Sequence, residues 1–128
     1  AVRDGQLENS GKWEPCRSPS PRHLRFAPGV SGVIYPPAVL SALRESAMAF
    51  REVCPRADDI WLNVHALRSG CRVKQLSKHP VHFPTVPRTQ SGGLLHDNWL
   101  AGGNDEQIRR TYGPADVRLL VAASQSAN

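Results

Sequence analysis

The fold is decided by the stretch CPRADDIWLNVHALRSG, which spans residues 54–70. Pro55 cannot continue a preceding helix, because it lacks an N–H and its ring crowds the carbonyl four residues earlier. A new helix therefore begins after Pro55, and its apolar residues fall at i, i+4 and i+7 on one face: Ile60, Val64 and Leu67. Gly70 is placed to end this helix, since glycine readily adopts the left-handed conformation that follows a helix. We predict a helix from Asp58 to Gly70 with one face in the core.

Two adjacent carboxylates, Asp58 and Asp59, open this helix. Asp58 is expected to cap the helix by accepting a backbone N–H, and both acids lie near the positive end of the helix dipole. On one interpretation the pair is purely structural, a cap and a dipole partner. On the other, one acid caps the helix while its neighbour points into a cleft as a general base, held within reach of the proton that it removes. The pattern alone does not decide between them.

Length and composition indicate one globular domain. The 128 residues suffice for a modest core, and a hydrophobic content of 40% suits a globular protein. The 11 prolines and 10 glycines predict much irregular chain. No apolar run approaches the roughly 18 residues of a membrane span, and no signal-peptide pattern opens the sequence. Because the chain does not begin with Met, we expect it to be a segment of something longer.

The three cysteines, Cys16, Cys54 and Cys71, are widely spaced and form no C-x-x-C pair. This spacing argues against a disulfide framework and against a structural zinc site, and it favours ordinary thiols in a reducing compartment.

The net charge of +5 predicts an anionic partner, for which nucleic acid, phospholipid headgroups and phosphorylated small molecules are the alternatives. The densest basic group is interleaved with Pro and Ser and consists of Arg17, Arg22 and Arg25. No basic helical face and no known nucleic-acid motif accompany it, so nucleic acid is the weak alternative.

The first 28 residues are predicted to be irregular. They are rich in turn formers, including four prolines: Pro15, Pro19, Pro21 and Pro28. Only Trp13 and the Leu24–Phe26 stretch offer apolar anchors. We expect this segment to be a tail, or a loop laid over a core formed by residues 29–123.

A short buried strand is predicted at Val33–Tyr35, where three β-forming residues follow a glycine. The two prolines after it end the strand and begin a helix that runs to about Cys54. A second short strand is expected at Arg72–Leu76. The predicted fold class is therefore α/β, with a small mixed sheet, two to three helices and long loops in a single domain over residues 1–128.

The last third of the chain is predicted to begin with a loop. Residues 91–103 contain two glycine pairs and are the candidate mobile loop. Asn104 and Gln107 have the spacing of a capping box, which predicts a helix that ends before Gly113. Val117–Ala123 is compatible with either a helix or a strand.

Two motifs in this order, GVIYPP at residues 32–37 and ADDIWL at residues 57–62, resemble a known family. They are similar to the acceptor-side half of bacterial GT-A-type glycosyltransferases, which build capsular and lipopolysaccharide sugars. The resemblance covers about Phe26 to Tyr112. It implies the C-terminal half of a GT-A fold, with a nucleotide sugar and a glycan acceptor as partners and a cytoplasmic location that includes the inner face of the membrane.

The same resemblance implies a role for each matching residue. In inverting members the second acid of the pair deprotonates the acceptor hydroxyl, so Asp59 would be the catalytic base. The residues that would bind the acceptor are Asp58, Trp61, Gly32 and Tyr35. His96 lies where some GT-A enzymes have a ligand for the divalent cation, Mn or Mg, that accompanies the nucleotide diphosphate.

The sequence departs from the family in one respect, because it contains no Asp-x-Asp metal motif. We therefore expect either the acceptor half of a longer enzyme, inactive without an N-terminal nucleotide-binding half, or a remnant that no longer catalyses. The alternative function is a non-catalytic basic module that binds an anionic glycan or nucleic acid. A further alternative is a fold fragment that self-associates through an exposed sheet edge.

Overall fold

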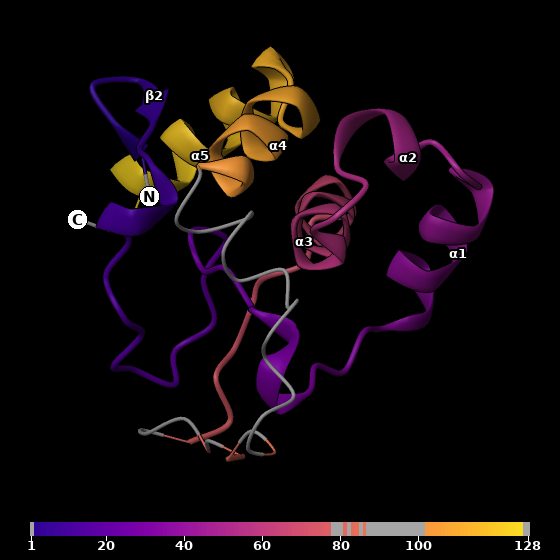
Figure 1. The fold of residues 1–128 in the computed structure, drawn as a ribbon. Coiled ribbons are helices and arrows are strands. Elements are labelled where there is room, and N and C mark those ends of the chain that lie inside the picture. The colour runs from indigo at the N-terminus through magenta and orange to yellow at the C-terminus, as the bar shows by residue number, and fades with distance from the viewer. Residues whose placement is uncertain (1, 78–80, 82, 85, 87–101, 127–128) are drawn as a thin grey trace.

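Helix α3 (Asp58–Arg68) lies at the centre of the structure, a computed structural model in which residues 2–77, 81, 83, 84, 86 and 102–126 are described (Figure 1). Helices α1 (Pro37–Glu45) and α2 (Phe50–Val53) lie on one side of it. Helices α4 (Gly103–Thr111) and α5 (Pro114–Gln125) lie on the other. Each of α1, α4 and α5 contacts α3, so the helix predicted from the quoted stretch organises the described part of the molecule.

The C-terminal end of α3 confirms the prediction made for Gly70. Its φ angle of 70° is in the left-handed region. The Gly70 N–H donates to the Leu67 carbonyl and the Cys71 N–H donates to the Ala66 carbonyl, both at 2.9 Å. These two bonds form a Schellman motif, which satisfies carbonyls that the last helical turn leaves unpaired.

The N-terminal end of α3 differs from the prediction. The N-cap is Ala57, and Asp58 is the first helical residue without a capping hydrogen bond. Ala57 takes this position because its side chain is only 4% exposed and packs into the core beside Cys54. The expected cap at Asp58 is therefore wrong, and a first-turn N–H, that of Ile60, is accepted instead by Asp59.

One apolar cluster forms the core, and the predicted stripe of α3 is at its centre. Its buried members are Cys54, Ala57, Ile60, Val64, Leu67, Ile108, Tyr112 and Leu120. The anchors expected in the N-terminal segment, Trp13, Leu24 and Phe26, pack against this cluster. The rings of Trp13 and Phe26 meet edge to face at 5.2 Å between centroids. The prediction that this segment lies over the core is confirmed.

The two predicted strands do not form a sheet. Val33–Tyr35 is not a strand and pairs with no other described segment, and Ile34 is 89% exposed. Arg72–Leu76 contributes a single bridge, between Val73 and Arg22. A segment with good β-forming residues remains a single extended chain when no neighbouring strand supplies ladder hydrogen bonds.

The sheet lies instead in the segment predicted to be irregular. Strands β1 (Val2–Arg3) and β2 (Gln6–Leu7) pair antiparallel across Asp4 and Gly5 and pack on α5. Both turn residues have positive φ angles, 51° and 76°, as the favoured two-residue hairpin turns require. The chain is thus a small mixed α/β protein with a two-stranded sheet and five helices in its described residues.

The helix predicted to start after Pro36 does begin at Pro37 but ends at Glu45. Residues 46–49 interrupt it, with Ala47 in the left-handed region at φ 47°, before α2 begins. The Ser46 hydroxyl donates to the Leu43 carbonyl at 2.7 Å, which satisfies a carbonyl at the break. Two helices therefore replace the single one predicted.

The C-terminal helices correct one prediction and settle an alternative that the sequence left open. Helix α4 starts at Gly103 with Gly102 as N-cap, so the capping box at Asn104 is wrong. The Gln107 side chain makes a different hydrogen bond from the one predicted, because its Oε1 accepts the Arg56 N–H at 2.9 Å. The ambiguous Val117–Ala123 stretch is helical, within α5.

Three further observations bear on the sequence predictions. Cys16, Cys54 and Cys71 are all free thiols. Among the described residues, no helix is long and apolar enough to span a bilayer. Most of the predicted 91–103 loop, His96 included, lies outside the described residues.

Candidate functional site

A large hollow of about 1790 Å³ opens along one face of α3. The α3 residues that line it include Asp59, Asn63 and Ala66, at i, i+4 and i+7. Residues 32–36 and 22–28 form further walls. Small-molecule pockets typically measure about 300–1,000 Å³, so this hollow has room for an extended ligand.

Asp59 is the half-buried acid in this hollow. One carboxylate oxygen accepts the N–H of Ile60 at 2.9 Å, which holds the side chain at the helix start. Burial raises the pKa of Asp59, and the charge of Asp58 adds to the increase, while the Ile60 N–H opposes it. A rigid carboxylate with a raised pKa beside a cavity has the properties of a general base.

Tyr35 and Gly32 line the same hollow as Asp59. Burial raises the pKa of the Tyr35 phenol, and the charges of Asp58 and Asp59 add to the increase, so the hydroxyl keeps its proton. A protonated phenol both donates and accepts hydrogen bonds. Gly32 has a φ of 88°, a backbone conformation that an L side chain rarely adopts, although the space around it is open.

The other predicted site residues do not join this group. Asp58 is exposed and lines a separate hollow of about 330 Å³ with Phe50 and Pro55. Trp61 lines neither hollow, since two residues along a helix place it about 160° around the axis from Asp59. Its ring packs edge to face on His65, 4.5 Å between centroids.

The predicted metal site cannot be built from the described residues. They contain no group of three or more His, Cys, Asp or Glu side chains that could hold a metal ion. His96, the predicted ligand, lies outside them.

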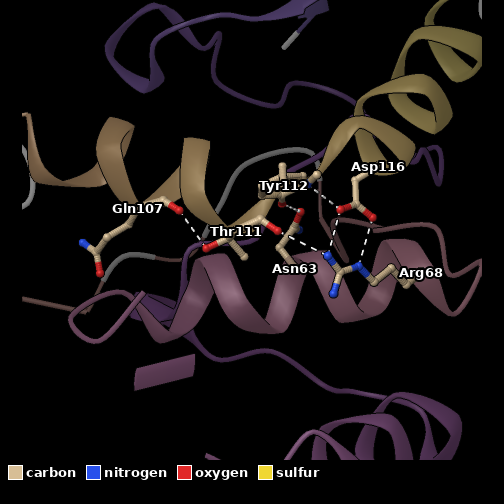
Figure 2. Close-up of polar contacts among 7 residues, drawn as sticks. Asn63, Arg68, Gln107, Thr111, Tyr112 and Asp116 are labelled. Atoms are coloured by element: carbon tan, nitrogen blue, oxygen red, sulfur yellow. Dashed lines mark hydrogen bonds and ion pairs between the residues drawn. The ribbon is translucent and has the colours of Figure 1, made fainter. Parts of the chain in front are cut away.

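Sequence reasoning missed Asn63 and Tyr112, which brace the wall of the hollow (Figure 2). The Tyr112 hydroxyl donates to Asn63 Oδ1 at 2.8 Å, and Asn63 Nδ2 donates to the Arg25 carbonyl at 3.3 Å. Burial above all raises the pKa of Tyr112. The i, i+4 spacing places Asp59 and Asn63 on one face of the helix. The hydrogen-bond partners of Asn63, Tyr112 and the Arg25 carbonyl, are revealed only by the fold.

A second polar network holds α3 against the junction of α4 and α5 (Figure 2). Arg68 donates to both carboxylate oxygens of Asp116, at 2.9 and 2.8 Å, and also to the Thr111 carbonyl. The Gly113 N–H donates to Asp116 at 2.9 Å. Burial alone would raise the pKa of Asp116, but these hydrogen bonds and the Arg68 charge outweigh it and lower the pKa. The network is structural, because Arg68 and Asp116 do not line the hollow.

The walls of the hollow carry more positive than negative side chains. Its acids are Glu8, Glu14 and Asp59, of which Glu8 is paired with Arg3 at 3.0 Å. Besides Arg3, the basic side chains that line it are Lys12, Arg17, Arg22, Arg25, Arg72 and Lys74. A concave surface with excess positive charge attracts anionic ligands.

His65 predicts a specific pH dependence of stability. It is 7% exposed, and its Nε2 has no hydrogen-bond partner in the described part of the chain. Burial lowers its pKa below 6.5, the Arg68 charge lowers it further, and the Asp116 charge opposes the decrease. The stability that neutral His65 provides is present above pH 6.5 and is lost as pH falls from there through the folded-state pKa.

We therefore expect the free energy of unfolding to decline from pH 7 to pH 5 more steeply in the wild type than in His65→Gln, which cannot titrate. Urea denaturation at each pH measures both slopes. Equal slopes for the two proteins would contradict the assignment.

No protein-family model, curated protein or solved structure matches this chain.

Proposed function

We propose that this chain is the acceptor-binding and catalytic-base half of a glycosyltransferase that uses a nucleotide-sugar donor. The observation that carries the proposal is the position of Asp59, a fixed, half-buried carboxylate of raised pKa on the wall of a large hollow. Two residues of the GVIYPP motif, Gly32 and Tyr35, line the same hollow. The two motifs that carry the family resemblance thus contribute to one site.

In the proposed reaction the acceptor hydroxyl lies beside Asp59. As its oxygen bonds to the anomeric carbon of the donor sugar, Asp59 accepts the hydroxyl proton. The bond from that carbon to the diphosphate breaks, and the nucleotide diphosphate leaves with the electron pair. Attack opposite the leaving group inverts the anomeric centre. A divalent cation, Mn or Mg, would stabilise the departing diphosphate.

Tyr35 is the described residue best placed to orient the acceptor, since its hydroxyl lies within the electrostatic range of both acids. Asp58 and Trp61 lie off the hollow, and their acceptor contacts stay predictions for a longer glycan. His96 stays the predicted metal ligand. A nucleotide-binding half, which the family resemblance implies, is proposed to complete the enzyme.

The test is sugar transfer by the full-length gene product carrying Asp59→Asn. Loss of transfer with the fold intact supports the proposal, and transfer at the wild-type rate removes it.

The basic walls of the hollow favour a second candidate, a non-catalytic module for an anionic glycan. This function requires the positive charges but not a general base. It therefore predicts glycan binding without any sugar transfer by the wild type, so the transfer assay separates the two candidates.

A further inference from the structure

Arg25 lines the hollow, and one buried nitrogen of its guanidinium group has no hydrogen-bond partner among the described residues. The side chain is half-buried, and the nitrogen is Nη1. A buried donor that lacks an acceptor destabilises the fold, and the cost is larger when the donor is charged. Such a group therefore indicates an acceptor atom that binds there, such as an ordered water or a ligand oxyanion.

The main chain of Arg25 is fixed close to the proposed base. Its carbonyl accepts a hydrogen bond from Asn63, one helical turn beyond Asp59 on the same face of α3. Residues spaced i, i+4 on a helix have Cβ atoms about 5–6 Å apart. One extended ligand can therefore reach both the carboxylate of Asp59 and the wall that carries Arg25.

Two further arginines, Arg22 and Arg72, line the same hollow as Arg25. Arg22 and Val73 exchange two backbone hydrogen bonds at 3.0 Å, and the His23 ring contacts the Cys71 carbonyl at 3.1 Å. This pairing holds Arg22 beside Val73, and Arg72 lines the hollow together with Arg22 and Arg25. Guanidinium groups bind carboxylate and phosphate with paired, planar hydrogen bonds.

We propose that the acceptor of this enzyme is an acidic glycan, whose carboxylate or phosphate binds at Arg25 while one of its hydroxyls lies at Asp59. The role of Asp59 in this inference rests on the proposed function, whereas the anion site at Arg25 does not depend on it. A nucleic acid is the weaker alternative, because no basic helical face and no known nucleic-acid motif accompanies these arginines in the sequence.

The experiment measures binding of tetragalacturonate and of its methyl ester to the chain by calorimetry. The ester has the same sugar rings without the charges. We expect tetragalacturonate to bind at least about 10-fold more tightly than the ester, since a hydrogen bond to a charged group contributes on this scale. Equal affinity of the acid and the ester for the wild type would overturn the proposal without any variant.

Variants then locate the anion. Arg25→Gln is expected to weaken tetragalacturonate binding by about 10- to 100-fold, and Arg25→Lys by less, because lysine keeps the charge but loses the planar fork. Arg51→Gln is the matched control, since Arg51 is exposed on α2 and does not line the hollow. An equal loss in Arg51→Gln would overturn the assignment to Arg25.

Two competitors identify the source of the anion. Inorganic pyrophosphate that displaces tetragalacturonate and binds more tightly would assign Arg25 to the donor diphosphate and overturn the acidic-acceptor proposal. Tighter binding of a single-stranded oligonucleotide would overturn it in favour of nucleic acid. Asp59→Asn should keep tetragalacturonate binding. A failure of the transfer proposal therefore leaves the anion site standing, and the reverse also holds.

Discussion

Replacing Asp59 by Asn is expected to lower sugar transfer by roughly 10²- to 10⁴-fold, the range that a positioned general base contributes. Asn keeps the size of the side chain and can still accept the Ile60 N–H, so the helix start is preserved. It cannot accept the acceptor's proton at neutral pH. The measurement is the initial rate of transfer by the full-length gene product, with circular dichroism to confirm the fold.

One control variant and one further measurement on Asp59→Asn test this prediction. Asp58→Asn changes an exposed acid that lines a different hollow, so its effect should stay below the roughly 10²-fold minimum for loss of a base. Asp59→Asn should also stabilise the fold at neutral pH. A raised folded-state pKa gives an acid stability that is present below its unfolded pKa and is lost as pH rises through the folded pKa. Equal losses of transfer in both variants would contradict a specific base.

Replacing Arg68 by Ala is expected to lower the free energy of unfolding by about 2–3 kcal/mol at pH 7. The Asp116 side chain is 6% exposed and would lose its charged partner, while Arg68 is 44% exposed, which keeps the loss below that of a fully buried pair. Urea denaturation measures this loss. The loss of stability in Arg68→Ala should become smaller in acid. The pKa of Asp116 is lowered in the folded state, so the stability that its ionised carboxylate contributes is present above pH 3.8 and is lost as pH falls through the folded-state pKa.

Arg109→Ala is the matched control for Arg68→Ala. Arg109 pairs with Glu106 at 3.2 Å, but both side chains are more than half exposed, at 63% and 54%. Removing a surface pair of this kind costs less than about 1 kcal/mol. A similar loss in the two variants would show that the Asp116 network has no special role.

Local signals predicted the central helix well. The break at Pro55, the apolar stripe from Ile60 to Leu67 and the stop at Gly70 all depend on residues within one or two turns, and the structure has each of them. The strands depended on a neighbour far along the chain. Val33–Tyr35 has the residues for a strand but no paired segment, which the sequence of that segment cannot reveal.

At the N-terminus, two strands form where the sequence predicted irregular chain. Asp4-Gly5 is a strong turn signal between residues that pair, but the strands are only two residues long and the prolines that follow suggested irregular chain. The capping errors at Asp58 and Asn104 have a common cause. In each case an earlier residue took the N-cap position: the buried Ala57 one residue before Asp58, and Gly102 two residues before Asn104.

The site was predictable in part. The hollow is lined by three of the predicted residues, Asp59, Tyr35 and Gly32. Trp61 was predicted to join them because it is close to Asp59 in the sequence, but two residues along a helix point it to a different side of α3. The brace formed by Asn63 and Tyr112 joins residues 49 positions apart, so no local pattern could indicate it.

The most direct test is an NMR titration of the Asp59 carboxyl carbon, with and without tetragalacturonate. The account predicts a pKa above the ordinary 3.8 for this group and a change in its signal when the oligosaccharide is added. A pKa at or below 3.8, together with a signal that the oligosaccharide leaves unchanged, would contradict the placement of a catalytic base in a glycan-binding hollow.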